Sequence, residues 1–139
     1  MSRKKDHEKR INELQERAKR TREGRDSALW DYLIKTDPDM FEAYQKVYEY
    51  GLLNGEHLPA KYRELILMGI LAFKGARDGV ISHAKTAYAL GITKGEMIDA
   101  AKTTLIPGGA PTFSTYLAAI KEIEEAEAKE NAVKTKSNN

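Results

Sequence analysis

The segment from Ala60 to Phe73 is apolar at most of its positions, and this feature constrains the fold more than any other. A helix that is apolar around most of its circumference has to be covered by neighbouring elements, so we expect this segment to be the central helix. Its one acidic residue is Glu64. No part of the sequence alternates apolar and polar residues as a half-buried strand does. The sequence therefore predicts an all-α protein.

Capping and breaking residues divide the rest of the chain into further helices, six to seven in all. Asp37-Pro38 is typical of a helix start, because a capping oxygen is followed by proline at the first helical position. Thr93 and Glu96 fit a capping box for a later helix. One face of the helix after Pro38 is expected in the core, and its residues are Phe41, Tyr44, Val47, Tyr48 and Gly51.

The chain is expected to consist of a basic helical arm (1–25), a single all-α domain (26–126) and a charged, partly disordered tail (127–139). The arm holds ten Lys or Arg against five Asp or Glu between residues 2 and 25. Two interpretations of it remain open. It binds RNA or an anionic membrane, or it is a solvated helix lying on its own domain or on a neighbouring subunit. Interspersed acids and the lack of aromatic residues favour the solvated helix.

Composition excludes several classes of function. The chain of 139 residues has no cysteine, which rules out disulfides, thiolate metal sites and thiol redox chemistry. Its formal net charge is only +2, so nucleic acid is not an expected partner. There is no apolar run long enough to span a membrane, and the N-terminus is too polar for a secretory signal. We therefore expect a soluble, cytoplasmic protein without a membrane partner.

Glu64 and His83 are the strongest candidates for chemistry. Glu64 shares its predicted helix face with apolar residues, namely Leu67, Met68 and Leu71. A buried carboxylate is costly unless it meets a donor. His83 lies between Val80 and Ala87 and so borders the core. If the two helices form an antiparallel pair, both side chains could line one cavity and relay a proton near neutral pH. The alternatives are a satisfied core or surface histidine and a first-turn acid favoured by the helix dipole.

Neither a metal site nor a nucleotide motif is expected. A metal site needs three or four convergent ligands, which one histidine with scattered acids does not provide. The segment 107–111 is rich in glycine and proline and predicts a loop, followed by a helix from about residue 112. Its Gly108 and Gly109 lack the preceding strand and the following Lys-Ser/Thr of a phosphate-binding loop. Their expected role is to let the backbone pass close to a neighbour or a ligand.

Several short motifs in a fixed order together resemble the carboxymuconolactone decarboxylase family, whose superfamily includes the alkylhydroperoxidase D proteins. The resemblance covers roughly residues 58 to 123. The motifs are Arg63-Glu64-Leu65-Ile66-Leu67, Ile81-Ser82-His83-Ala84-Lys85-Thr86-Ala87, Leu90-Gly91-Ile92-Thr93 with Glu96 and Ile98, and Pro107-Gly108-Gly109-Ala110-Pro111. The resemblance implies an alkylhydroperoxidase D-like helical bundle.

The resemblance also implies a function. The peroxidase branch carries Cys-x-x-Cys-x-x-x-His, and aligned on His83 its cysteines fall on Ala76 and Gly79. Thiol peroxidase chemistry is therefore impossible here, and the decarboxylase-like branch, which uses no cofactor, remains. The resemblance implies that a histidine and neighbouring polar groups handle protons. We hypothesise that His83 delivers or shuttles a proton and that Glu64 tunes or reloads it. Arg77 or Lys85 could neutralise a substrate carboxylate, although Arg77 could equally be a surface residue beside Asp78. Gly108 and Gly109 are expected to line the substrate.

Two functions from different classes are left open. One is a cofactor-free lyase or isomerase, decarboxylase-like, acting on a small organic acid or lactone. The other is a non-catalytic helical oligomer that binds a small ligand or a partner protein. The family implies a homo-oligomer, a trimer or a hexamer, and the amount of apolar helix face agrees with an oligomer.

Overall fold

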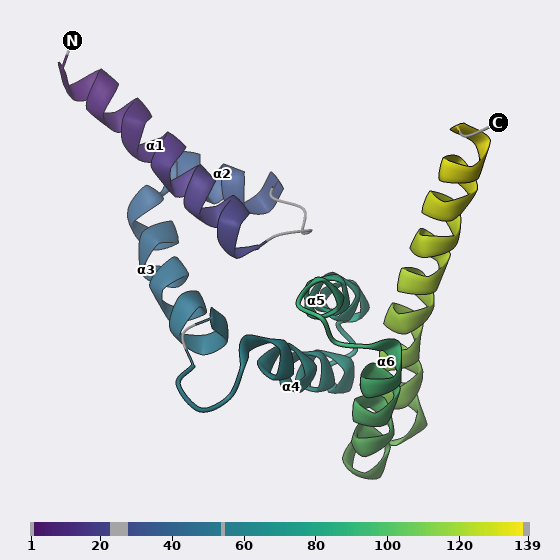
Figure 1. Cartoon of the computed structure of the whole chain (residues 1–139). Helices are drawn as coiled ribbons and strands as arrows, with labels where there is room; N and C mark the ends of the chain where they lie inside the picture. The colour runs from purple at the N-terminus through teal and green to yellow at the C-terminus, as the bar shows by residue number, and fades with distance from the viewer. Residues whose placement is uncertain (1, 23–27, 54, 138–139) are drawn as a thin grey trace. The chain divides into compact units, whose positions relative to one another are not determined.

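A computed structural model describes residues 2–22, 28–53 and 55–137 of the chain (Figure 1). These residues form helices joined by short connections and contain no strand, which confirms the predicted all-α class. The chain divides into two compact units, residues 1–60 and residues 61–139. Each unit has its own cluster of buried apolar side chains.

The first unit contains α1 (Ser2–Thr21), α2 (Ala28–Thr36), α3 (Pro38–Tyr48) and a short π-helix, η1 (Glu49–Leu53). The three α-helices pack on a small core formed by Leu14, Ala18, Ile34 and Phe41. The apolar stripe of α1 is buried against α2 and α3, so α1 is part of this compact unit. The expected arm (1–25) and domain (26–126) remain a prediction.

The helix start predicted at Asp37-Pro38 is confirmed. The Asp37 side chain accepts a hydrogen bond from the Met40 amide at 3.0 Å, and Pro38 begins α3. Phe41 and Tyr48 are buried as predicted, whereas Val47 is 68% exposed. The prediction for Val47 was wrong within this unit, because the contact with α1 and α2 covers a narrower stripe of α3 than the aromatic spacing suggested.

The second unit contains α4 (Ala60–Phe73), α5 (Arg77–Ala89) and α6 (Lys94–Ser137). The predicted capping box begins α6, since Thr93 and Glu96 exchange hydrogen bonds of 2.8 and 3.1 Å between side chain and backbone. All three helices contribute to one core, whose buried members are Met68, Ala72, Val80, Ala84, Ala87, Ile92, Met97, Ala101, Tyr116, Ala119, Ile120 and Ile123.

Helix α6 reverses direction at Gly109, which has a positive φ of 68° and a ψ of −174° (Figure 1). An ion pair of 2.8 Å between Lys94 and Glu127 joins the beginning of α6 to its second segment, so the two segments run antiparallel. The segment 107–111 is therefore a tight turn of one non-helical residue, where a loop was predicted. Helix α6 continues through Ser137, and the partly disordered tail remains a prediction.

One side of α4 is not covered within the second unit. Glu64, Met68 and Ala72 are buried, while Ile66, Ile70 and Phe73 are 55%, 54% and 66% exposed. We expected α4 to be covered on all sides, but within this unit only the face with Glu64, Met68 and Ala72 is covered. The apolar composition of the other face has no explanation in the packing of this unit.

Candidate functional site

Glu64 and His83 form a hydrogen-bonded pair between α4 and α5. The distance from Glu64 Oε2 to His83 Nδ1 is 2.6 Å. The Glu64 side chain is 1% exposed and the His83 side chain is 14% exposed. The two residues are nineteen positions apart in sequence, and the structure brings them together as predicted.

The packing of the two helices explains the pair. Figure 1 shows α5 nearly end-on while α4 lies across the view, so the helices cross steeply and are not the antiparallel pair considered from the sequence. Gly79 lies where α5 approaches Leu71, and a Cβ at this glycine would be 3.3 Å from a Leu71 methyl carbon. Met68 and Val80 are fully buried in the same core. This crossing places Glu64, in the first turns of α4, within reach of His83 in the middle of α5.

The geometry fixes the chemical roles of the two imidazole nitrogens. A carboxylate accepts hydrogen bonds, so His83 Nδ1–H donates to Glu64. Nε2 is then the nitrogen that can give or take a proton, because the partner of one ring nitrogen determines the state of the other. The Glu64 carboxylate also stabilises the imidazolium when His83 is protonated. The arrangement is suited to general acid–base chemistry.

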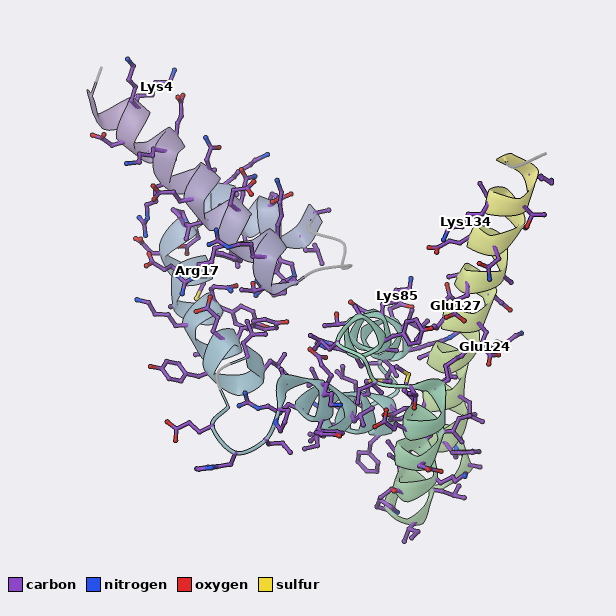
Figure 2. All side chains as sticks on the ribbon, in the orientation of Figure 1. Lys4, Arg17, Lys85, Glu124, Glu127 and Lys134 are labelled. Atoms are coloured by element: carbon purple, nitrogen blue, oxygen red, sulfur yellow. The ribbon has the colours of Figure 1, made fainter. Side chains whose placement is uncertain are left out.

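The other predicted site residues lie elsewhere on the unit. Arg77 is the first residue of α5 and is exposed. Lys85 is exposed and lies on the side of α5 turned away from α4 (Figure 2). The roles of Arg77 and Lys85 toward a substrate therefore remain predictions.

Gly108 and Gly109 have a structural reason to be glycine. The Thr112 hydroxyl donates to the Gly108 carbonyl at 2.9 Å. A Cβ at Gly108 would be 2.4 Å from Thr112 Oγ1, and Gly109 adopts a left-handed φ that disfavours side chains. The reversal of α6 therefore requires both glycines. Their predicted contact with a substrate remains a prediction.

A pocket of about 510 Å³ lies between α4 and α6, and it is nearly all apolar. Its lining includes Leu65, Ile66, Gly69, Ile70, Phe73, Ala100, Thr103, Thr104, Pro107 and Thr112. Glu64 is not among them. On a helix with 3.6 residues per turn, the lining residues of α4 lie on the side opposite Glu64. The proton-transfer pair and this apolar pocket are therefore two different features of α4.

The sequence profile of the carboxymuconolactone decarboxylase family matches residues 38–122, more than half of the chain. The chain belongs to the carboxymuconolactone decarboxylase family. Glu64, His83 and the Gly108-Gly109 turn all fall inside the matched region of this family member. The resemblance inferred from the short motifs is thereby confirmed, and the matched region extends further toward the N-terminus than residue 58.

A crystal structure of a candidate carboxymuconolactone decarboxylase from Burkholderia xenovorans LB400 has a similar fold. The two chains superpose with a TM-score of 0.71 over 89% of this chain and 98% of the other, at 23% sequence identity. This similarity supports the fold. Among proteins of curated function, none shows significant sequence similarity to this family member.

The described part of the chain shows neither a cluster of metal ligands nor a membrane-spanning helix. Within residues 2–22, 28–53 and 55–137, no three His, Asp or Glu side chains are grouped as metal ligands would be. None of the described helices is long and apolar enough to cross a membrane. The cytoplasmic location expected from composition stays a prediction.

Tyr116 lies near the Glu64–His83 pair. The sequence predicted it only as a core residue. It is fully buried on α6, and its hydroxyl donates to the Leu65 carbonyl at 3.5 Å, next to Glu64. Burial raises the pKa of the Tyr116 hydroxyl, so it stays protonated. Its spacing with Ile120 and Ile123 indicates an inward face but gives no sign of a partner fifty-one residues away.

Proposed function

We propose that this family member is a cofactor-free, decarboxylase-like lyase acting on a small organic acid or lactone. The observation that carries the proposal is the 2.6 Å contact between His83 Nδ1 and Glu64 Oε2 across two helices. A histidine oriented by a buried carboxylate can deliver a proton to carbon and recover it afterwards. The absence of cysteine leaves this pair, and no thiol, as the reactive group shared with the family.

The reaction has two steps. The bond between the α-carbon and the carboxylate breaks, carbon dioxide leaves, and the electron pair is delocalised into a neighbouring carbonyl as an enolate. His83 Nε2–H then protonates the carbon, and the neutral imidazole keeps its Nδ1–H on Glu64. A proton from solvent returns His83 to the imidazolium. Its partial exposure of 14% gives that proton a route.

A cationic side chain would hold the substrate carboxylate before it leaves. Arg77 and Lys85 lie on the same helix as His83. Helical periodicity places Arg77 roughly 120° around α5 from His83 and Lys85 roughly 160° around it. Arg77 is therefore the better candidate for this role, and Gly108 and Gly109 are proposed to line the substrate from α6.

We further propose that the protein is a homo-oligomer, a trimer or a hexamer. The exposed face of α4 carries Ile66, Ile70 and Phe73, and α6 also exposes apolar side chains, since Leu105 and Ile106 are 43% and 91% exposed. An apolar surface of this kind is typical of a subunit interface. Further copies of the chain would cover it.

A second candidate function is a non-catalytic helical oligomer that binds a small ligand or a partner protein. The apolar pocket between α4 and α6 favours it. The three threonine hydroxyls at the pocket donate to backbone carbonyls of their own helix, namely those of Asp99, Ala101 and Gly108. Few polar groups remain to hold a carboxylate, so an occupant of this pocket would be a hydrocarbon group.

The experiment that separates the two functions uses a panel of lactone acids and β-keto acids. Release of carbon dioxide is measured with the intact protein, and the product is analysed after reaction in deuterated water. The proposal predicts turnover of at least one compound and one deuterium on the product carbon. Binding of panel compounds without release of carbon dioxide would favour the non-catalytic oligomer.

A further inference from the structure

Four aromatic side chains of the first unit surround the guanidinium group of Arg22. The guanidinium carbon lies 4.6 Å from the ring centroid of Trp30, 5.5 Å from Phe41, 5.9 Å from Tyr44 and 4.2 Å from Tyr48. We call these four rings the aromatic box. Aromatic faces attract cations at such distances, and the attraction is strongest when the cation is removed from water. Arg22 is only 5% exposed.

The rings of the box are themselves held in place by their neighbours. Trp30 of α2 stacks on Tyr44 of α3 with 5.0 Å between centroids and 12° between ring planes. Trp30 also packs on Phe41 at 6.3 Å in a tilted arrangement. Phe41 is fully buried and Tyr48 is 9% exposed, whereas Tyr44 is 38% exposed. The box is therefore built by α2 and α3, and Tyr44 forms its edge toward solvent.

Gln45 supplies an oriented acceptor inside the box. Its amide nitrogen donates to Thr21 Oγ1 at 2.8 Å and to Glu49 Oε1 at 2.9 Å. Both amide hydrogens are thus engaged, so the carbonyl oxygen faces Arg22 and accepts from Nη1. Gln45 is fully buried, which fixes this orientation.

The combination selects one class of cation. Aromatic faces alone attract any organic cation, including a fully methylated ammonium ion. The Gln45 carbonyl needs an N–H donor directed at it, and a planar guanidinium provides such donors while stacking on rings. An alkylammonium ion has donors but no flat face to lie on the rings. A guanidinium group therefore satisfies every feature of the box.

We propose that the aromatic box is a guanidinium-binding site whose resident occupant is Arg22, and that the box vacated by Arg22 binds alkylguanidinium ions from solution in preference to alkylammonium ions. Arg22 follows α1 directly, and its amide still donates to the Ala18 carbonyl at 3.0 Å. The occupied box therefore fastens the end of α1 to α2 and α3 through the Arg22 side chain. This proposal does not depend on the chemistry of Glu64 and His83.

The test uses the full chain with Arg22→Ala and titrates ethylguanidinium chloride at constant ionic strength. Trp30 is the one tryptophan of the chain, so its fluorescence reports on the box. We expect saturable binding about tenfold tighter than that of ethylammonium, because only the guanidinium both stacks and donates to Gln45. The unsubstituted protein should show no change at the same concentrations, because a tethered occupant competes at high effective concentration.

Two matched variants keep the proposal falsifiable. Arg22→Ala combined with Gln45→Leu retains the rings and should lose the preference for guanidinium. Amide hydrogen exchange of α1 should quicken in Arg22→Ala and slow again on adding ethylguanidinium. If Arg22→Ala does not fold, recovery of its helical circular dichroism by ethylguanidinium supports the proposal. No binding by the folded variant, no recovery of the unfolded one, or equal affinity for the two cations would overturn it.

Discussion

The Glu64 carboxylate and the His83 imidazole meet at 2.6 Å between two steeply crossing helices, with Glu64 almost fully buried. A buried charge needs a partner, so the pair is expected to matter for stability as well as for chemistry.

Replacing His83 with Ala leaves the Glu64 carboxylate without this donor. We expect the free energy of unfolding to fall by about 2–3 kcal/mol, because breaking a buried pair leaves a desolvated charge. Urea denaturation followed by circular dichroism measures the change. Asp78→Asn on the exposed first turn of α5 is the control and should change stability by less than about 0.5 kcal/mol. Equal effects of the two substitutions would show that the pair contributes nothing to folding.

Gly108→Ala tests the reversal of α6. The added Cβ would be 2.4 Å from Thr112 Oγ1, and Thr112 is 4% exposed and cannot move into solvent. We expect a loss of about 1–3 kcal/mol from this overpacking. Gly95→Ala in the first turn of the same helix meets nothing closer than 3.8 Å. That control should be neutral or slightly stabilising, by less than about 1 kcal/mol. The measurement is the urea midpoint of each variant.

The ion pair of Arg17 and Glu49 makes the first unit sensitive to acid. Arg17 donates two hydrogen bonds, of 2.7 and 2.6 Å, and these lower the pKa of Glu49 below its ordinary value. A carboxyl group with a depressed pKa in the folded state stabilises the fold above its unfolded pKa of about 4.3. That contribution is lost as the pH falls through the folded pKa.

Arg17→Met should therefore cost about 1 kcal/mol at neutral pH and flatten the decline in stability with acid. Urea midpoints measured between about pH 6 and about pH 3 give the comparison. Lys19→Met removes an exposed cation from the same helix and should leave the acid dependence unchanged. An acid dependence that is the same in Arg17→Met and in the unsubstituted protein would exclude Glu49 as a contributor.

The proposed oligomer should depend on the exposed face of α4. Ile70→Glu places a charge in the lining of the apolar pocket, so it should shift the protein from oligomer to monomer. Val133→Glu is the matched control, because Val133 is also exposed but lies on α6 outside the pocket lining. Sedimentation velocity measures the assembly. If the unsubstituted protein sediments as a monomer at every concentration, the proposed oligomer is contradicted.

Much of this fold was predictable because helix signals are local. The caps at Asp37 and Thr93 and the spacing of apolar residues act within a few positions, and the structure confirms them. The sequence offered the meeting of Glu64 and His83 as one interpretation, for helices assumed to be antiparallel; the structure shows the contact in a different helix arrangement. The steep crossing of α4 and α5 was not predictable, because periodicity gives a helix face but no crossing angle.

Other features depend on contacts between distant residues and left little trace in the sequence. Arg22 at the end of a charged helix has the pattern of a solvated side chain, yet it lies among rings of α2 and α3. Glycine and proline at 107–111 indicated a break in the helix but not that a single residue, Gly109, would reverse it. The exposed face of α4 is apolar like its buried face, so composition could not distinguish them.

Proton transfer by Glu64 and His83 is tested most directly by comparing carbon dioxide release by the unsubstituted protein, His83→Ala, Glu64→Gln and Asp78→Asn on one substrate. We expect His83→Ala to lower kcat by at least about 100-fold and Glu64→Gln by about 10-fold or more, while Asp78→Asn has no effect. Circular dichroism confirms that each variant is folded under the assay conditions. Turnover that is unchanged in folded His83→Ala and Glu64→Gln would contradict proton transfer by this pair.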